Sequence, residues 1–480
     1  MVPADRGGGL MRPDLLTEPV EGLDEALGVV DAFDEALVGG LLRPRPAQAA
    51  ALAGLADAVS GTPLAGRVAE AAGQAAAGTA GEDHFVALAA ARTALMGSVH
   101  DALAAQADKA TGRARCTEEV PPAASGQPAN LLLAARAWLC DLARSGWRGI
   151  DHDVVSGAAP VVSAMLPDPA LRRLSVLLDG FAAELAASCP GAAMDRVPAR
   201  RWADLWARGV LLTVQCAGGA PATGTATGRL LPLGVDVQEH ATAVQAQVHA
   251  VFEPADGGAS RLVRAGVSVP KPDTVVSAGL WQLLRPHMSL LAAVSEGRSM
   301  DLADMPVTAE GDLLWSDEHA RPGEPADPFA TARVALSGAA ATAAAPLDRH
   351  PAHLAVPVFL EGYAYETAAG DEDAPDGGAP AFVLAGQRLA VDTDRVPAAG
   401  PLTADAVARS QACIGLLRWD AGAFRLQPLA VEATVRKKTV AIHAGAWAGG
   451  TADKAGAKAE KAATDALAVL RERAGRLLRK

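Results

Sequence analysis

The hydrophobic pattern of the chain changes its period once, near residue 215, and this change restricts the possible folds more than any other feature. Before that point apolar residues recur at three- and four-residue intervals, as in the series Leu171, Leu174, Leu178, Phe181 and Leu185. Such spacing lines one face of a helix. After that point apolar and polar residues alternate, as in Val244, Ala246 and Val248, which is typical of a half-buried antiparallel strand. The sequence therefore predicts an α+β fold.

The domain organisation follows from these periods and from the length of the chain. A chain of 480 residues is too long for one ordinary hydrophobic core, so several domains are expected. We also predict a long loop over residues 114–128 and a Pro-rich division of the β part near residues 316–328. The four predicted segments are a disordered N-terminus (1–16), an all-α helical domain (17–215), a mainly antiparallel β region (216–448) and a basic amphipathic helix (449–480).

Several strands of the β region can be assigned from alternation and turn residues. We predict a three-stranded meander from TATGRLLPLGVDV, ATAVQAQVHAVFE and RLVRAGVSVP. Further strands are predicted in MSLLAAVSEGRSMDLADM, with a turn at Glu296-Gly297, and in LAVPVFLEGYAYE paired with PAFVLAGQRLAVD across the acidic loop TAAGDEDAPDGG. A hairpin is expected to turn at residues 420–422, and a short helix is expected over Val275–Leu284. The pattern leaves open whether these strands form a barrel or a sandwich.

The charge of this alanine-rich chain is concentrated unevenly. The formal net charge is −12, yet from Arg436 onward eleven Lys and Arg residues stand against four acids. The C-terminal part therefore carries +7 and residues 1–435 carry −19. An acidic body does not favour polyanions, whereas the basic C-terminal part does.

Cysteine usage and hydropathy indicate the compartment. The five cysteines are scattered and form no Cys-x-x-Cys pair, which fits free thiols in a reducing cytosol. The N-terminus has no apolar signal-peptide region, and no segment is apolar for the roughly 18 residues that a membrane span needs. We therefore predict a cytoplasmic protein without a membrane segment.

No motif points firmly to catalysis or to a cofactor. The sequence has no phosphate-binding GxxxxGK[ST] loop, no dinucleotide-binding GxGxxG motif and no GxSxG nucleophile motif. His152-Asp153 is interpreted as a helix start capped by Asp151 or Asp153. We expect His350 and His353 in a solvated edge loop and His249 on the polar face of a strand. The prediction is a non-enzymatic chain without cofactor or metal, although a hydrolase whose site is assembled from distant residues stays an alternative.

Two tryptophans, Trp202 and Trp206, lie on one side of a predicted helix in RWADLWARGVLLT, opposite Asp204 and Arg208. Large rings in an alanine-rich helix fill space that small side chains leave empty. We favour a helix that joins the α domain to the sheet. The alternative is an exposed aromatic anchor for a partner protein.

Two basic groups are candidate partner-binding surfaces. Arg436, Lys437 and Lys438 follow a predicted strand and could also protect an edge strand from aggregation. In the last helix, Ala463, Leu467, Leu470, Ala474 and Leu477 form an apolar stripe. The candidate binding residues of that helix are Arg473, Arg476 and Arg479. Docking on the acidic body or on a protein partner is favoured over nucleic acid, because no aromatic residues alternate with the charges.

The stretches RWADLWARGVLLT and LPLGVDVQEHATAVQAQVHAVFE resemble a group of uncharacterised proteins from high-GC bacteria. These are encoded beside SWIM zinc-finger proteins, MoxR-type AAA ATPases and von Willebrand factor A (VWA) domain proteins. The resemblance implies an accessory member of an ATPase-driven system, and it supplies no functional residues. The chain itself has neither ATPase motifs nor the DxSxS pattern of the VWA adaptor.

These observations favour a non-catalytic cytoplasmic scaffold or adaptor, whose partners would include an AAA ATPase or a VWA protein. The alternative from another class is a nucleic-acid-binding component that uses the β region and the basic tail. Salt-sensitive binding would distinguish the second function from the first.

Overall fold

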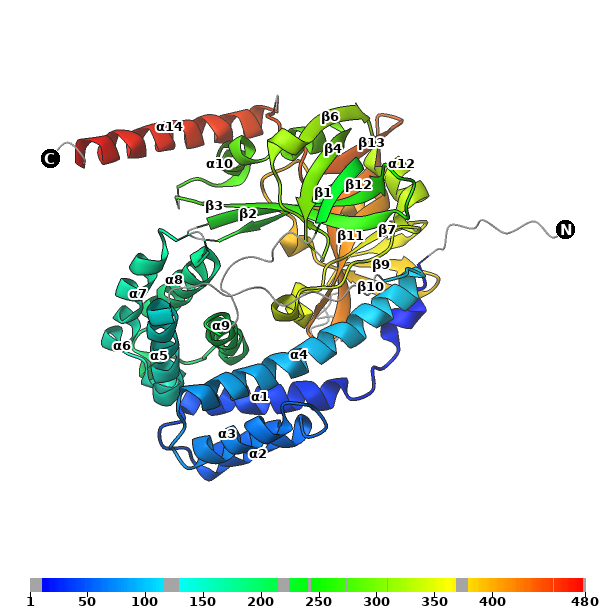
Figure 1. The fold of residues 1–480 in the computed structure, drawn as a ribbon. Helices are drawn as coiled ribbons and strands as arrows, with labels where there is room; N and C mark the ends of the chain where they lie inside the picture. The colour runs from blue at the N-terminus through cyan, green and yellow to red at the C-terminus, as the bar shows by residue number, and fades with distance from the viewer. Residues whose placement is uncertain are drawn as a thin grey trace.

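The structure is a computed structural model in which the chain forms an α+β fold, with a helical bundle beside two β-sheets (Figure 1). The residues that it describes are 11–115, 129–168, 170–214, 224–240, 243–272, 274–308, 310–367, 379–451 and 453–477. The predicted loop at 114–128 and the acidic loop before strand PAFVLAGQRLAVD fall almost entirely outside these residues.

The helical bundle occupies the N-terminal half, as the three- and four-residue spacing predicts. Its core combines the rings of Phe33, Phe85, Trp147 and Phe181 with many closely packed alanines. Its helices are α1 (Leu23–Gly39), α2 (Pro46–Ala58), α3 (Ala65–Ala76), α4 (Glu82–Thr111), α5 (Ala129–Ser145), α6 (His152–Ser156), α7 (Ala158–Met165), α8 (Arg172–Ala187) and α9 (Ala199–Leu212).

Helix α4 belongs to two hydrophobic cores. Phe85 and Leu88, near its start, are buried inside the bundle. Val99 and Leu103, in its second half, are buried in the core of the β region instead. The helix passes from one half of the molecule to the other (Figure 1). The all-α segment predicted at 17–215 is therefore not a separate packing unit.

The N-terminal segment is ordered earlier than we predicted. A 3₁₀ turn covers Pro13–Thr17, and Leu15 and Leu16 are buried in the same core as the end of α4. Burial of these two leucines explains why residues 13–16 are not part of a disordered tail. Residues 1–10 lie outside the described part of the chain.

The first sheet starts with the predicted meander, in which β1, β2 and β3 pair antiparallel. β3 then pairs with β5, β5 with β4, and β4 with β1, so these pairings form a closed ring. This arrangement is a small barrel. Its strands, with β6 at the edge, are β1 (Gly224–Glu239), β2 (Ala243–Pro254), β3 (Arg261–Pro270), β4 (Arg298–Val307), β5 (Asp312–Leu313) and β6 (Ala320–Pro325).

Two expectations about this part of the chain are wrong. The first half of MSLLAAVSEGRSMDLADM is helix α11 (Leu290–Glu296), because its apolar residues are buried at helical spacing and Gly297 ends it with a φ of 61°. The charged segment at 316–328 is not a linker, since β6 lies within it and pairs with β4. The short helix expected before it is present as α10 (Leu280–Leu284) after a 3₁₀ turn.

The second sheet has the order β7-β11-β12-β10-β9-β8, with β13 also on β12. The hairpin β11–β12 turns at Asp420–Gly422 as predicted. β8 pairs with β9, whereas β7 pairs with β11. The strands are β7 (Val356–Glu361), β8 (Ala364–Glu366), β9 (Ala381–Leu384), β10 (Gln387–Val391), β11 (Ser410–Asp420), β12 (Ala423–Val435) and β13 (Lys438–His443). The remaining helices are α12 (Pro328–Thr331), α13 (Ala404–Ala408) and α14 (Lys454–Leu477).

The two sheets contact each other at β1 and β12. A Cβ atom placed at Gly234 would lie 2.9 Å from the Cβ atom of Leu429. This close approach requires a residue without a Cβ. The second sheet thereby covers the face of β1 and β2 that would otherwise be exposed to water.

Candidate functional site

The two tryptophans of α9 lie inside the bundle and are not a partner surface. Trp202 is 1% exposed and Trp206 is fully buried. The indole N–H of Trp206 donates to the carbonyl of Leu139 at 2.9 Å, and Trp202 packs edge-on against Trp147. The exposed-anchor alternative is therefore wrong. The rings also pack against helices rather than against a sheet, so they do not join the two halves.

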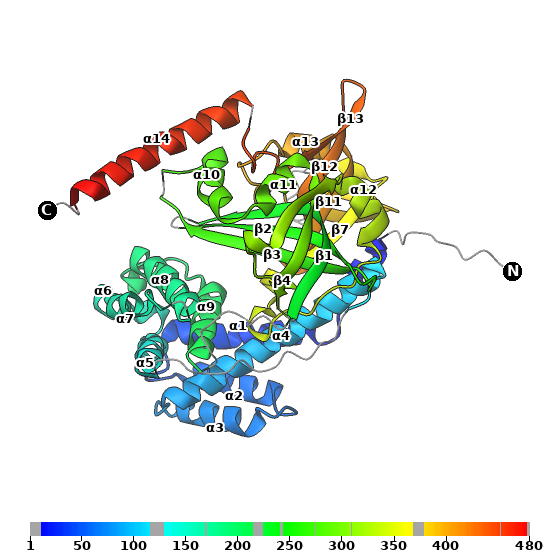
Figure 2. The same cartoon turned by 45° about the horizontal axis from the view of Figure 1, so that its top comes forward.

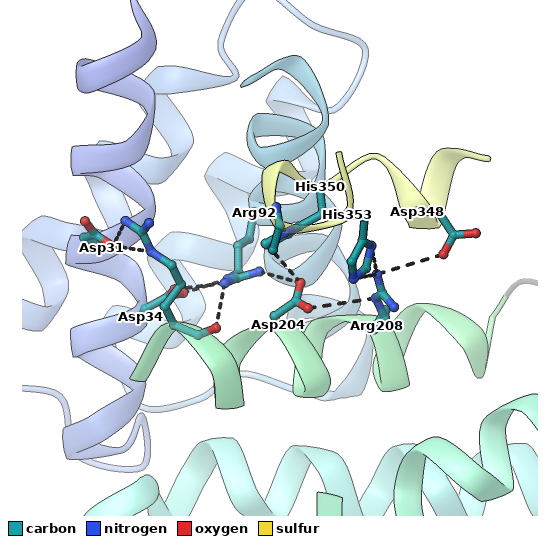
Figure 3. A network of polar contacts seen from close by, with 10 residues as sticks. Asp31, Asp34, Arg92, Asp204, Arg208, Asp348, His350 and His353 are labelled. Carbon is teal, nitrogen blue, oxygen red and sulfur yellow. Dashed lines mark hydrogen bonds and ion pairs between the residues drawn. The ribbon is translucent and has the colours of Figure 1, made fainter. Parts of the chain in front are cut away.

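The opposite, polar face of α9 makes that junction instead (Figure 3). The Oδ1 atom of Asp204 lies 3.4 Å from Nε2 of His350 and 3.5 Å from Nη1 of Arg92. One turn later, Arg208 donates to Nδ1 of His353 at 2.8 Å. Because both histidines precede the second sheet, α9 contacts the β half through charges and imidazoles.

The network continues behind Asp204 into the bundle. Arg92, whose side chain is 1% exposed, donates to both oxygens of Asp34 at 2.7 and 2.9 Å. Its Nη2 atom also donates to the backbone carbonyl of Arg200, whose own side chain pairs with Asp31. A paired and hydrogen-bonded guanidinium can be buried at tolerable cost, whereas an unpaired one cannot. This network therefore depends on all of its members.

Asp348 connects the same segment to a further helix. Its Oδ1 atom accepts from Arg173 of α8 at 3.0 Å and lies 3.9 Å from Arg208. Arg349 reaches Asp101 of α4 at 3.4 Å. Three helices of the bundle thus hold the segment that leads into the second sheet.

The imidazole of His350 is neutral at physiological pH. Burial lowers its pKa to about 4, although Asp204 opposes the shift. Its Nδ1 atom accepts from the backbone N–H of Ala352, so the ring proton of the neutral form is on Nε2, which faces Asp204. His350 is only 8% exposed, which corrects the expectation of a solvated loop, whereas His353 keeps an exposed face.

A second polar cluster lies between the two sheets. Asp236 accepts from Arg418 and from Gln427, each at 2.8 Å, and all three side chains are buried. His249 lies next to them with its Nε2 atom unpartnered among the described residues. Burial lowers its pKa to about 3. His249 is therefore buried although it was expected on the polar face of this strand.

The terminal helix α14 is attached to the body through residues up to Leu467, which packs against the core of the β region. Ala463 packs so closely on the turn before α10 that a Cβ at Gly279 would lie 2.5 Å from the Cβ of Ala463. Arg285 donates to Glu460 at 3.0 Å and to the carbonyl of Ala448 at 2.8 Å. Beyond these contacts the helix extends away from the body (Figures 1 and 2).

The extending part, residues 468–477, is called the distal half of α14. Val469 is 47% exposed and Leu470 is 39% exposed. Arg473 and Arg476 are exposed as well, and Arg476 pairs with Glu472. The predicted binding residue Arg479 lies outside the described residues.

The other basic group forms the turn between β12 and β13. Arg436, Lys437 and Lys438 are exposed, and Arg436 and Lys437 have positive φ angles of 50° and 65°. Within the described sheet β13 pairs only with β12, so the cations stand beside an edge. The free end of α14 points away from β13, which carries this turn (Figures 1 and 2). The fold therefore does not unite the two basic groups.

Other groups that chemistry could use are also held in structural roles. Asp151 caps α6 by accepting from the N–H of Val154 at 2.9 Å, as predicted for this stretch. Burial raises the pKa of the Cys140 thiol to about 12, and Cys413 is buried with its pKa raised too. Such thiols are not nucleophilic at neutral pH.

Sequence reasoning missed Asp34, Arg92, Asp236 and Arg418. The available signal was a single charge inside an apolar run, as in VDV around Asp236 or LLRW around Arg418. A charge in that position needs a buried partner, but the partner is distant in sequence.

In the described part of the chain, no three His, Cys, Asp or Glu side chains are grouped to hold a metal ion. None of the helices described there is long and apolar enough to cross a bilayer. Comparison with known proteins gives no matching family model, and no curated protein or solved structure matches the chain.

Proposed function

We propose that the protein is a non-catalytic cytoplasmic adaptor that binds a protein partner through the distal half of α14. The observation that carries this proposal is a helix fixed at one end whose apolar residues Val469 and Leu470 remain exposed at the other. An isolated amphipathic helix gains most of its stability from packing its apolar face. A partner that covers this face would complete the packing.

The charge of the same segment indicates the kind of partner. From Val469 to the C-terminus the sequence has five Lys and Arg residues and one acid. An apolar patch with a basic rim fits an acidic protein surface that contains an apolar groove. The partner in this proposal is an AAA ATPase or VWA-domain protein of the kind that the sequence resemblance implies.

The non-catalytic part of the proposal rests on the two polar clusters. Their arginines and carboxylates neutralise each other, and the His350 ring is held neutral with no serine or cysteine among its described contacts. Such clusters join parts of a fold. The free end of α14 points away from β13 (Figure 2), and this separation of the two basic groups argues against the nucleic-acid alternative.

The test compares the natural chain and two full-length variants for binding to a purified MoxR-type AAA ATPase and to a purified VWA-domain protein. One variant combines Val469→Ser, Leu470→Ser, Arg473→Glu and Arg476→Glu. The matched control combines Arg436→Glu and Lys437→Glu, which changes two exposed cations of the β12–β13 turn. We expect the first variant to lose binding by at least about tenfold in Kd, or about 1.4 kcal/mol, and the control to bind normally.

Equal binding by all three forms would refute the role of α14. The nucleic-acid function would be supported instead if the protein bound a short DNA duplex, if both variants weakened that binding, and if it fell steeply as the salt concentration rose.

A further inference from the structure

A cavity of about 210 Å³ lies where the end of α4 meets the second sheet. Its walls include the apolar residues Met11, Leu336, Val358, Leu360 and Leu384, and Arg113 lines it as well. It is separate from the polar clusters described above and from α14.

The end of α4 places Arg113 in this position. Gly112 ends the helix with a φ of 64°, and the N–H of Arg113 returns to the carbonyl of Asp108. This left-handed turn is one that glycine adopts without strain. The chain therefore reverses at Gly112, and the side chain of the next residue enters the interior, where it is 7% exposed.

The guanidinium of Arg113 has no carboxylate partner among the described residues. Its Nη2 atom donates to the carbonyl of Pro357 at 3.0 Å, while its Nε and Nη1 atoms are buried without a hydrogen bond. Asp108 acts on this charge only through space, because the hydrogen bond of its Oδ2 atom comes from Arg115 at 2.7 Å. Burial lowers the pKa of Arg113 to about 10, so the group still carries its charge at neutral pH. An uncompensated buried charge is strongly unfavourable.

A second arginine in the wall of the same cavity is neutralised. Arg333 pairs with Glu361 and Glu432 and lies over the ring of Phe359 at 5.2 Å. It belongs to a π-helical turn, Ala332–Leu336, a rare conformation that occurs frequently at functional sites. Among the described residues that line the cavity, Arg113 is therefore the cation without a carboxylate partner.

We propose that this cavity binds a short aliphatic carboxylate, whose anionic head neutralises Arg113 and whose chain lies against the apolar wall. By comparison with a cavity of about 150 Å³ that holds benzene, the volume fits about eight non-hydrogen atoms. One cation matches one negative charge, and four buried leucine and valine side chains match an alkyl chain.

The test measures the unfolding temperature and calorimetric binding of the full chain with hexanoate, hexanamide and inorganic phosphate. We expect hexanoate to bind and to raise the unfolding temperature, because a ligand that binds the folded state stabilises it. Hexanamide has the same shape without the charge and is expected to have little effect. Phosphate has the charge without the alkyl chain and should bind more weakly than hexanoate.

Two variants separate Arg113 from its surroundings. Arg113→Met should weaken hexanoate binding at least about tenfold, since a charge-assisted contact is lost. Arg333→Lys changes an arginine of the same cavity but keeps the positive charge that pairs with Glu361 and Glu432, and it should keep binding within about threefold. If Arg113→Met does not fold, Arg113→Lys can be used in its place, because lysine keeps the positive charge. The comparison of hexanoate with hexanamide on the natural chain then shows whether the cavity requires a negatively charged ligand.

Equal effects of hexanoate and hexanamide, or no effect of hexanoate, would overturn the proposal. Phosphate binding as tightly as hexanoate would overturn the carboxylate class.

Discussion

At the scale of single residues, the burial of Arg92 depends on its charged partners. It is buried and donates to both oxygens of Asp34. Replacing it with methionine would leave the carboxylate buried without its partner. We expect Arg92→Met to lower the free energy of unfolding by about 3–5 kcal/mol, as found when one member of a buried pair is removed. Urea denaturation measures the loss.

The double variant Arg92→Met with Asp34→Leu removes both charges and is expected to be more stable than Arg92→Met alone. A double variant that is less stable than the single one would show that the charge of Asp34 is stabilised by other groups.

The buried histidines predict how stability depends on pH. The pKa of His350 is about 4 in the folded chain, below the roughly 6.5 of an unfolded chain. The unfolded chain therefore takes up this proton first, and the stabilisation present above pH 6.5 is lost as the pH falls toward 4. Between pH 7 and 5 the loss from His350 is about 2 kcal/mol. His350→Asn should lose correspondingly less over this range, which denaturation at the two pH values tests. An equal loss in both proteins would exclude His350 as its source.

The residues that sequence reasoning misplaced are those whose environment comes from distant segments. The burial of Trp202 and Trp206 follows from their helix stripe, but the structure packs them against other aromatic rings, Trp202 against Trp147 and Trp206 against Phe33 and Phe85. His249 was expected on a polar face because alternation identifies two faces of a strand but not what covers each one. Here the second sheet covers it, and that contact joins β1 to β12.

At the scale of elements, α4 connects the stability of the two halves. Leu88 is buried in the bundle core and Leu103 in the β core. Because one continuous helix supplies both, we expect a single heat-absorption peak in calorimetry. Leu88→Ala and Leu103→Ala should each lower that same peak, at a cost of about 2–5 kcal/mol. Two peaks, each sensitive to only one substitution, would show that the halves unfold separately.

The turn between β12 and β13 has a sequence that does not suit its backbone. Arg436 and Lys437 both have positive φ angles, a conformation in which Asn-Gly is preferred in two-residue hairpins. Arg436→Asn with Lys437→Gly should raise the free energy of unfolding by about 1 kcal/mol or more. Chemical denaturation beside the Lys438→Gln control tests this, and an unchanged or lower stability would show that the turn is not strained.

The elements themselves were largely predictable, because periodicity is a local property. The meander β1–β3, the β11–β12 hairpin and the stripe of α8 follow from it directly. Helix α11 was mistaken for a strand because a seven-residue apolar segment fits both periods. The ring closure of the first sheet depends on the β1–β4 pairing, which no local pattern reports.

At the scale of the whole molecule, the end of α14 differs in charge from the rest of the chain. From Val469 onward five Lys and Arg stand against one acid, while the whole chain carries −12, and this end extends from the body (Figure 1). Such an arrangement orients an acidic partner before contact. We expect the association rate of the partner to fall at least about threefold between about 50 and 300 mM salt, with a smaller change in the dissociation rate. Stopped-flow mixing measures both. A rate independent of salt would mean that apolar contact alone selects the partner.

The continuity of α4 also restricts how the sequence can vary in length. Inserting one residue between Leu88 and Val99 would rotate everything beyond it by about 100° and move it by about 1.5 Å. One of the two cores would then receive the wrong face of the helix. Even seven inserted residues, which nearly restore the rotation, would shift the halves apart by about 10 Å. Insertions and deletions are therefore tolerated in the connecting loops, while the length of this helix must stay constant.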